Sequence, residues 1–160
     1  MSSLRDFLGD QTVSGDFVLR TAAAGDTPRI RRLIRWVQIN PTGLDWRRFI
    51  IAVDAAGNML GCGQLKLHGD EIQELASIAV EPAYRRRGVA TAIIEHLIAS
   101  APRPLYLTCR SSLGGFYEKW GFQLIGEAQM PAYFRRLSRL ATMLMSLARY
   151  DETLLVMVLK

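Results

Sequence analysis

The stretch from Glu74 to Ser100 constrains the fold most, because it reads as a strand, a basic glycine turn and a helix in direct succession. Residues 72–80 are rich in β-forming side chains, and residues 89–98 carry apolar side chains at helical spacing. Between them stands the run Arg85-Arg86-Arg87-Gly88. The first turn of a helix carries unpaired N–H groups and the positive end of the peptide dipoles. This segment therefore predicts an anion-binding turn that suits a phosphate.

Length and composition favour one compact domain over residues 1–160, since 49% of the 160 residues are hydrophobic and 22% are charged. The formal charge of +5 comes from arginines spread over many segments, which favours anionic ligands in general. Charged and turn residues interrupt every apolar stretch, so we expect neither a signal peptide nor a membrane span. The expected location is the cytoplasm.

The two cysteines, Cys62 and Cys109, lie far apart in segments that resemble strands. This spacing favours reduced, buried thiols over a disulfide framework, and it matches no zinc pattern. We therefore expect no metal.

The element pattern predicts an α/β (α+β) fold with a central mixed, mostly antiparallel sheet of about seven strands flanked by helices. The segment at 105–109 follows a helical crossover, so it should lie parallel to the strand at 72–80 in one βαβ unit. Ser111 or Ser112 could cap the short helix after it. Strands are expected at residues 16–22, 49–54, 59–67, 72–80, 105–109, 122–127 and 153–159, and helices near 28–39, 44–47, 88–100, 111–120 and 131–149.

The segment from Pro131 to Arg149 is amphipathic, with Leu140, Leu144 and Leu147 among its apolar positions and several arginines beside them. We interpret it as a helix that packs its apolar side against the core and exposes its basic side to solvent. A helix that lies on a membrane surface or binds a partner is the alternative.

Three motifs in this order resemble the GNAT superfamily of N-acetyltransferases, which bind acetyl-CoA. Arg85-Arg86-Arg87-Gly88-Val89-Ala90 fits the Q/R-x-x-G-x-G/A cofactor turn of that family. Val80-Glu81-Pro82-Ala83-Tyr84 fits its lead-in, and Phe116-Tyr117-Glu118-Lys119-Trp120-Gly121-Phe122 fits its later Phe-Tyr-Glu-Lys-x-Gly-Phe segment. The resemblance covers roughly Met59 to Ile125 and implies a single-domain GNAT-like fold with acetyl-CoA as co-substrate.

The resemblance also implies how the co-substrate is held. Backbone amides from Arg86 to Thr91 would wrap the pyrophosphate, and the strand ending at Val80 would pair through its main chain with the pantetheine arm. In many relatives an asparagine stands where this chain has Arg110, which leaves three alternatives for its contact with the pantetheine: Ser111 replaces it, Arg110 replaces it, or neither does. The implied cofactor-binding residues are Ile78, Ala79, Val80, Arg85, Arg86, Arg87, Gly88, Val89, Ala90, Thr91, Ser111 and Phe116.

Glu74 occupies the position where several GNAT enzymes carry their general base, which usually acts through water. Acetyl transfer to an amine requires loss of an amine proton, and a carboxylate among apolar neighbours is a stronger base than one in water. By strict alternation Glu74 would share a face with Ile78 and Val80. A solvated glutamate at a strand end, or a salt-bridge partner, is the alternative.

Tyr117 matches the tyrosine that in many relatives protonates the departing CoA sulfur, so the resemblance implies a general acid here. The alternative is a half-buried aromatic side chain whose only role is to pack its helix against the rest of the protein. A covalent step on Cys109 is not expected, because no His or acid follows it at triad-like spacing. We assign no role to His68 or His96, which we interpret as solvated or capping residues.

These features favour a cytoplasmic N-acetyltransferase that acts on a primary amine of a small molecule, peptide or protein. A non-catalytic acyl-CoA-binding module is the alternative. The dispersed arginines argue against a nucleic-acid-binding domain. We expect an amine acceptor as partner, no nucleic acid, no membrane, and a monomer or a homodimer.

Overall fold

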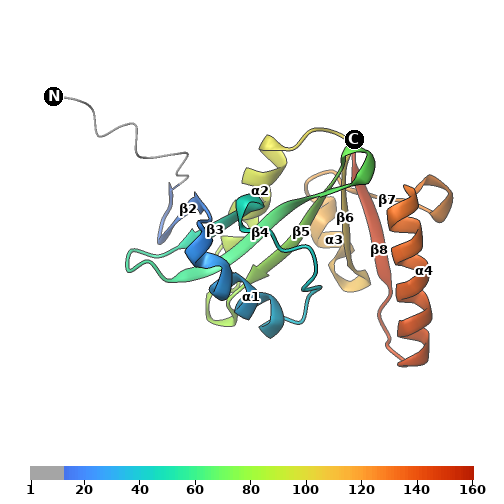
Figure 1. Cartoon of the computed structure of the whole chain (residues 1–160), viewed down its shortest axis with the longest axis horizontal. Helices are drawn as coiled ribbons and strands as arrows, with labels where there is room; N and C mark the ends of the chain where they lie inside the picture. The colour runs from blue at the N-terminus through green and yellow to red at the C-terminus, as the bar shows by residue number, and fades with distance from the viewer. Residues whose placement is uncertain (1–12) are drawn as a thin grey trace. The chain divides into compact units, whose positions relative to one another are not determined.

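The computed structural model describes residues 13–160, whose helices and strands are labelled in Figure 1. These residues form two compact units. Unit 1 consists of residues 13–66 together with Leu75–Ser100. Unit 2 consists of Leu67–Glu74 together with Ala101–Lys160.

Unit 1 contains a run of antiparallel strands. β1 (Val13–Ser14) pairs with β2 (Phe17–Thr21), β2 with β3 (Phe49–Val53), and β3 with β4 (Met59–His68). β5 (Ile72–Val80) begins in unit 2 and continues into unit 1, where it lies next to β4 in the sheet. The described residues form eight strands, because the two-residue β1 adds to the seven that the sequence predicts.

Helices cover both faces of the unit 1 strands. α1 (Thr27–Trp36) buries Ile30, Leu33 and Ile34 in a cluster that includes Cys62 of β4. α2 (Val89–Ser100) covers the other face, where the missing side chain of Gly63 leaves room for Ile93. α1 ends three residues earlier than predicted, because Gln38 adopts the left-handed conformation (φ 58°) that closes a helix.

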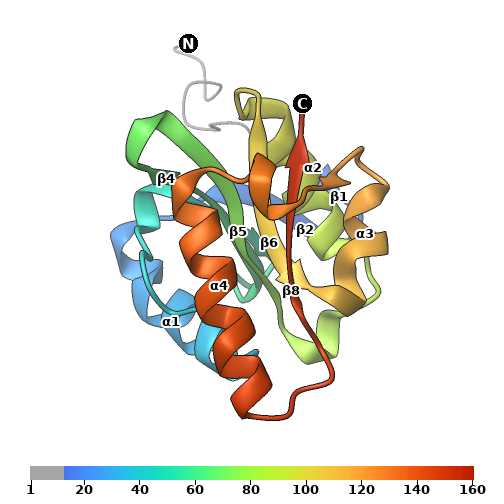
Figure 2. The ribbon, with the colours of Figure 1, turned by 90° about the vertical axis from the view of Figure 1, so that its right-hand side faces the viewer.

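Unit 2 is built around β8 (Leu154–Leu159), which pairs antiparallel with β6 (Leu105–Arg110) and with β7 (Gln123–Leu124). Helix α3 (Gly114–Glu118) and helix α4 (Ala132–Leu147) lie on opposite sides of β8 (Figure 2). Phe134 of α4 packs with Val156 and Val158 in the core of this unit.

Two expectations for unit 2 were wrong. β7 is shorter than the predicted 122–127, because the chain turns at Gly126 into the short helix η6 (Glu127–Gln129). Neither Ser111 nor Ser112 caps the helical segment that follows β6, since the Ser111 hydroxyl accepts a hydrogen bond from the Thr153 amide instead.

Helix α4 also differs from the expectation of a core-facing helix. Phe134 is fully buried, but Leu140, Leu144 and Leu147 are at least half exposed. Leu137, Ala141 and Met145 are half-buried, so α4 turns one stripe inward along most of its length and exposes the neighbouring leucines.

The remaining single-turn helices connect these elements. They are η1 (Ala24–Asp26), η2 (Trp46–Arg48), η3 (Gly69–Glu71), η4 (Pro82–Tyr84) and η5 (Ser111–Leu113).

Candidate active site

The basic turn of unit 1 joins η4 to α2 and has the backbone shape expected of an anion-binding loop. Arg86 (φ 62°) and Gly88 (φ 79°) are both left-handed, which turns the chain sharply before Val89 starts the helix. Within residues 13–160, the amides of residues 86–91 donate to no protein acceptor. A Cβ placed on Gly88 would meet no atom within 4 Å, so the space in front of this turn is open. The turn therefore offers unpaired donors to a ligand.

Within residues 13–160, no carboxylate neutralises the charge of this turn. Arg85, Arg86 and Arg87 are exposed, and in the described part of the chain none of them pairs with a carboxylate. Arg87 instead places its guanidinium 5.4 Å from the ring centre of Tyr84. Three positive charges beside unpaired amides suit a phosphate or a diphosphate.

The end of β5 lies in unit 1 between β4 and α2. A Cβ on Gly61 of β4 would come within 2.9 Å of the carbonyl oxygen of Ala79 and of a methyl group of Val89. The two glycines of β4, Gly61 and Gly63, therefore let residues 78–80 pack closely beneath α2. These are the residues expected to bind a ligand through their main chain.

β5 continues through Ser77, but the backbone there is irregular, with φ 58°. The Ser77 hydroxyl accepts a hydrogen bond from Nε2 of Gln64 at 2.9 Å. A left-handed residue breaks the regular alternation of side chains along a strand. The expectation of strict alternation from Glu74 to Val80 was therefore wrong.

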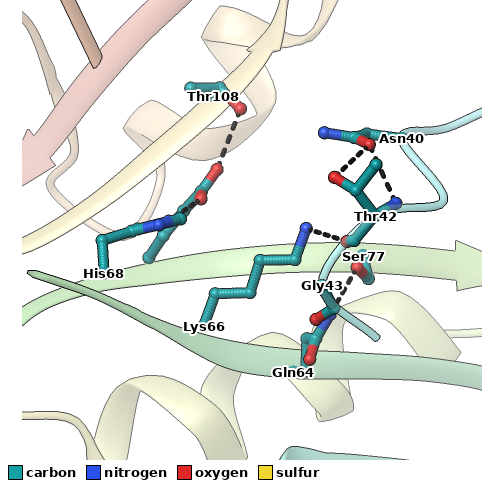
Figure 3. A network of polar contacts seen from close by, with 9 residues as sticks. Asn40, Thr42, Gly43, Gln64, Lys66, His68, Ser77 and Thr108 are labelled. Atoms are coloured by element: carbon teal, nitrogen blue, oxygen red, sulfur yellow. Dashed lines mark hydrogen bonds and ion pairs between the residues drawn. The ribbon is translucent and has the colours of Figure 1, made fainter. Parts of the chain in front are cut away.

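A second polar group of unit 1 connects β4 to the loop after α1 (Figure 3). Lys66 is buried and donates to the Thr42 carbonyl at 2.8 Å, and Nε2 of Gln64 lies 3.3 Å from the Gly43 carbonyl. Asn40 accepts from both the amide and the hydroxyl of Thr42. Among the described residues, Oε1 of Gln64 is buried without a hydrogen-bond donor.

Glu74 lies in unit 2 and is only 5% exposed. Its Oε2 is 2.6 Å from Nε2 of His68, and its Oε1 accepts from the Thr108 hydroxyl at 3.0 Å (Figure 3). The alternative of a solvated glutamate was therefore wrong. Glu74 is a buried carboxylate with a partner on each oxygen.

The structure also corrects our interpretation of His68 as a solvated or capping residue. Its side chain is 14% exposed, pairs with Glu74 and stacks on Tyr133 with ring centres 3.7 Å apart. No local motif in the sequence indicates this pair. The short gap between the predicted strands at 59–67 and 72–80 was the one available signal, since a tight turn brings the strands before and after it together.

Tyr117 lies on α3 and is buried among aromatic rings. Phe116 and Phe122 both meet it edge to face, with ring centres 5.2 and 6.2 Å away. Burial, together with the nearby Cys109 thiol, raises the pKa of the Tyr117 phenol well above its ordinary value. The phenol therefore keeps its proton throughout the neutral range.

The remaining predicted residues of unit 2 have structural contacts. Ser111 exchanges hydrogen bonds with Thr153, and half-buried Phe116 lies 5.2 Å from the Lys119 ammonium group. Arg110 is exposed and lies 3.8 Å from Glu152. Cys109 is a free, buried thiol whose pKa is raised by burial to about 11, so it is a poor nucleophile at neutral pH.

Within residues 13–160, His, Cys, Asp and Glu side chains form no group of three that could hold a metal ion. In that same part of the chain, no helix combines the length and the apolar character needed to cross a bilayer.

A family model described as an acetyltransferase (GNAT) domain matches residues 45–124. No curated protein matches the chain.

Solved structures with a similar fold were also found. N-acetylglutamate synthase from Neisseria gonorrhoeae, complexed with coenzyme A and L-arginine, has a TM-score of 0.68 and 24% identity over 89% of this chain. This chain covers only 33% of that enzyme. Rv2747 from Mycobacterium tuberculosis, in complex with CoA and NLQ, has a TM-score of 0.68 and 22% identity, with 89% of this chain and 99% of that one covered. The ribosomal-protein-S18-alanine N-acetyltransferase from Escherichia coli has a TM-score of 0.61 and 19% identity, with 89% and 92% covered.

Proposed function

Because the chain belongs to the GNAT acetyltransferase family, we propose that it transfers the acetyl group of acetyl-CoA to a primary amine of a small molecule, peptide or protein. The observation that carries this proposal is the turn from Arg85 to Thr91. Within the described residues, the amides of residues 86–91 have no protein acceptor, the three arginines have no carboxylate partner, and Gly88 leaves the approach open. These are the properties that a diphosphate requires of its binding site.

The proposed cofactor-binding residues divide between the two units. In unit 1, residues 85–91 would hold the pyrophosphate, and the main chain of Ile78, Ala79 and Val80 would hold the pantetheine arm. In unit 2, Ser111 and Phe116 are the proposed contacts. When bound, acetyl-CoA supplies the electrophilic thioester carbonyl.

Two side chains of unit 2 would move the protons. The Glu74 carboxylate takes a proton from the acceptor amine, directly or through water, because only the neutral amine has a lone pair with which to attack. The Tyr117 hydroxyl gives its proton to the departing thiolate. The Tyr117 phenol is protonated at neutral pH, as a proton donor must be.

Thiol release from acetyl-CoA, measured against a panel of amines, amino acids and peptides, tests this function. The panel should include glutamate and a peptide with an N-terminal alanine, given the names of the structural neighbours. We expect turnover with at least one acceptor and a loss of about 100-fold in kcat for Glu74→Gln, the low end for a general base. Tyr117→Phe should also lower kcat.

Unchanged turnover in both variants would remove these two catalytic assignments. Tight binding of CoA without turnover across the whole panel would support the alternative, a non-catalytic acyl-CoA-binding module.

A further inference from the structure

The Glu74 carboxylate is held by one partner on each oxygen, and all of these residues belong to unit 2. Thr108 donates its hydroxyl to Oε1 at 3.0 Å, and the His68 nitrogen Nε2 lies 2.6 Å from Oε2. In the proposed function Glu74 is an ionised base before it takes a proton, and an ionised carboxylate can only accept hydrogen bonds. The role proposed for Glu74 therefore requires a proton on Nε2 of His68.

The imidazole of His68 is itself held in place by α4. Tyr133 stacks on it at 3.7 Å with 22° between the ring planes, and fully buried Phe134 meets it edge to face at 5.7 Å. The plane of the imidazole is therefore fixed by two rings, and its rotation within that plane is fixed by Glu74.

We propose that His68 is a positioning residue for Glu74, holding the carboxylate in one orientation through its Nε2 proton so that the remaining lone pairs face the acceptor amine. This inference rests on the proposed function, in which Glu74 is the general base. A base acts only within hydrogen-bond reach of the proton that it removes, and small displacements of a reacting group cost large factors in rate. Two fixed donors prevent the carboxylate from rotating away.

Two substitutions of His68 separate positioning from a purely structural role. His68→Gln keeps an N–H donor on a side chain of similar reach, whereas His68→Leu fills the space without a donor. Thr108→Ser and Thr108→Val form the matched pair on the other oxygen. Melting temperatures of all four variants identify any loss of folding.

We expect His68→Leu to lower kcat about 10- to 100-fold while the KM for acetyl-CoA stays within about twofold, and His68→Gln to recover most of the loss. A wild-type kcat in His68→Leu, or a kcat in His68→Gln as low as in His68→Leu, would overturn the inference. The proposed function fails in a different way, namely through absence of turnover in the wild type or a wild-type rate in Glu74→Gln.

Nitrogen-15 NMR of the histidines gives a readout that does not depend on activity. The spectrum of the wild-type protein should show His68 with its proton on Nε2, and Glu74→Gln should shift that signal. An Nε2 without a proton in the wild type would overturn the proposed contact.

Discussion

Lys66 donates from its ammonium group to the carbonyl oxygen of Thr42 across 2.8 Å, so a buried lysine of β4 holds the loop that follows α1. Gln64, two residues earlier on the same face of the strand, reaches the neighbouring carbonyl of Gly43. The loop at residues 40–43 therefore depends on two side chains of one strand for its position.

Replacing Lys66 with Met should release this loop. The Thr42 carbonyl would lose a charged donor, which costs about 1–3 kcal/mol of unfolding free energy. Amide hydrogen exchange at residues 42–44 should become faster. Lys119→Met, on an exposed lysine, is the control and should change stability by less than about 0.5 kcal/mol. Unaltered exchange in the Lys66 variant would contradict the role of this contact.

Replacing Gly88 with Glu should abolish CoA binding through a like-charge conflict with the phosphates. Gly57→Glu is the matched control, because Gly57 has φ 80° where Gly88 has φ 79°, and a Cβ on either residue meets no atom within 4 Å. Both variants strain the backbone equally, so both should lose about 1 kcal/mol of stability or somewhat more. Calorimetry should show loss of CoA affinity only in Gly88→Glu. Equal affinities in the two variants would remove the phosphate site from this turn.

Gly61→Ala should destabilise unit 1 by about 1–3 kcal/mol, because the new methyl group would lie 2.9 Å from the backbone oxygen of Ala79. That oxygen cannot move without shifting β5. Gly25→Ala is the control, since a Cβ there meets nothing within 4 Å and its φ is not left-handed. Chemical denaturation measures the stability of both variants. Equal unfolding midpoints for Gly61→Ala and Gly25→Ala would show that β4 has room for a side chain at residue 61.

The two thiols should be unreactive in the native protein. Burial raises the pKa of Cys62 to about 12, with a contribution from Glu81, and that of Cys109 to about 11. Less than about 1% of either thiol is then ionised at pH 8. A chromogenic disulfide reagent should label both cysteines quickly only after denaturant is added. Rapid labelling of the native protein at pH 8 would contradict this.

The same pKa shifts make stability depend on alkaline pH. A folded-state value above the ordinary 9.0 stabilises the protein fully below pH 9, and this contribution disappears as the pH rises toward 11 and 12. The melting temperature should therefore fall above pH 9. In a protein with both cysteines changed to alanine, the fall should be smaller.

The basic turn and its flanking elements could be predicted because their signals are local. A β-rich run, three arginines, a glycine and a helical apolar pattern follow one another without a gap, and the structure has β5, the turn and α2 in that order. The family resemblance and the GNAT-like fold are confirmed by the domain match and by the solved neighbours.

The surroundings of Glu74 could not be predicted, because they depend on distant residues and on one unusual backbone angle. Thr108 lies 34 positions away from Glu74, and the ring that fixes His68 comes from α4. Ser77 is left-handed, although serine has none of glycine's freedom there. A prediction that assumes a regular strand therefore assigns the side chains before Ser77 to the wrong face of the sheet relative to those after Ser77.

The left-handed Ser77 also carries a conformational cost. A serine held at φ 58° is strained by about 1–3 kcal/mol, and such a conformation persists only where the surrounding structure enforces it. Two side chains of β4 meet Ser77, because Gln64 donates to its hydroxyl and the Cys62 thiol lies against its carbonyl oxygen. The irregular backbone of β5 is therefore stabilised by the neighbouring strand and not by a local preference of its own sequence.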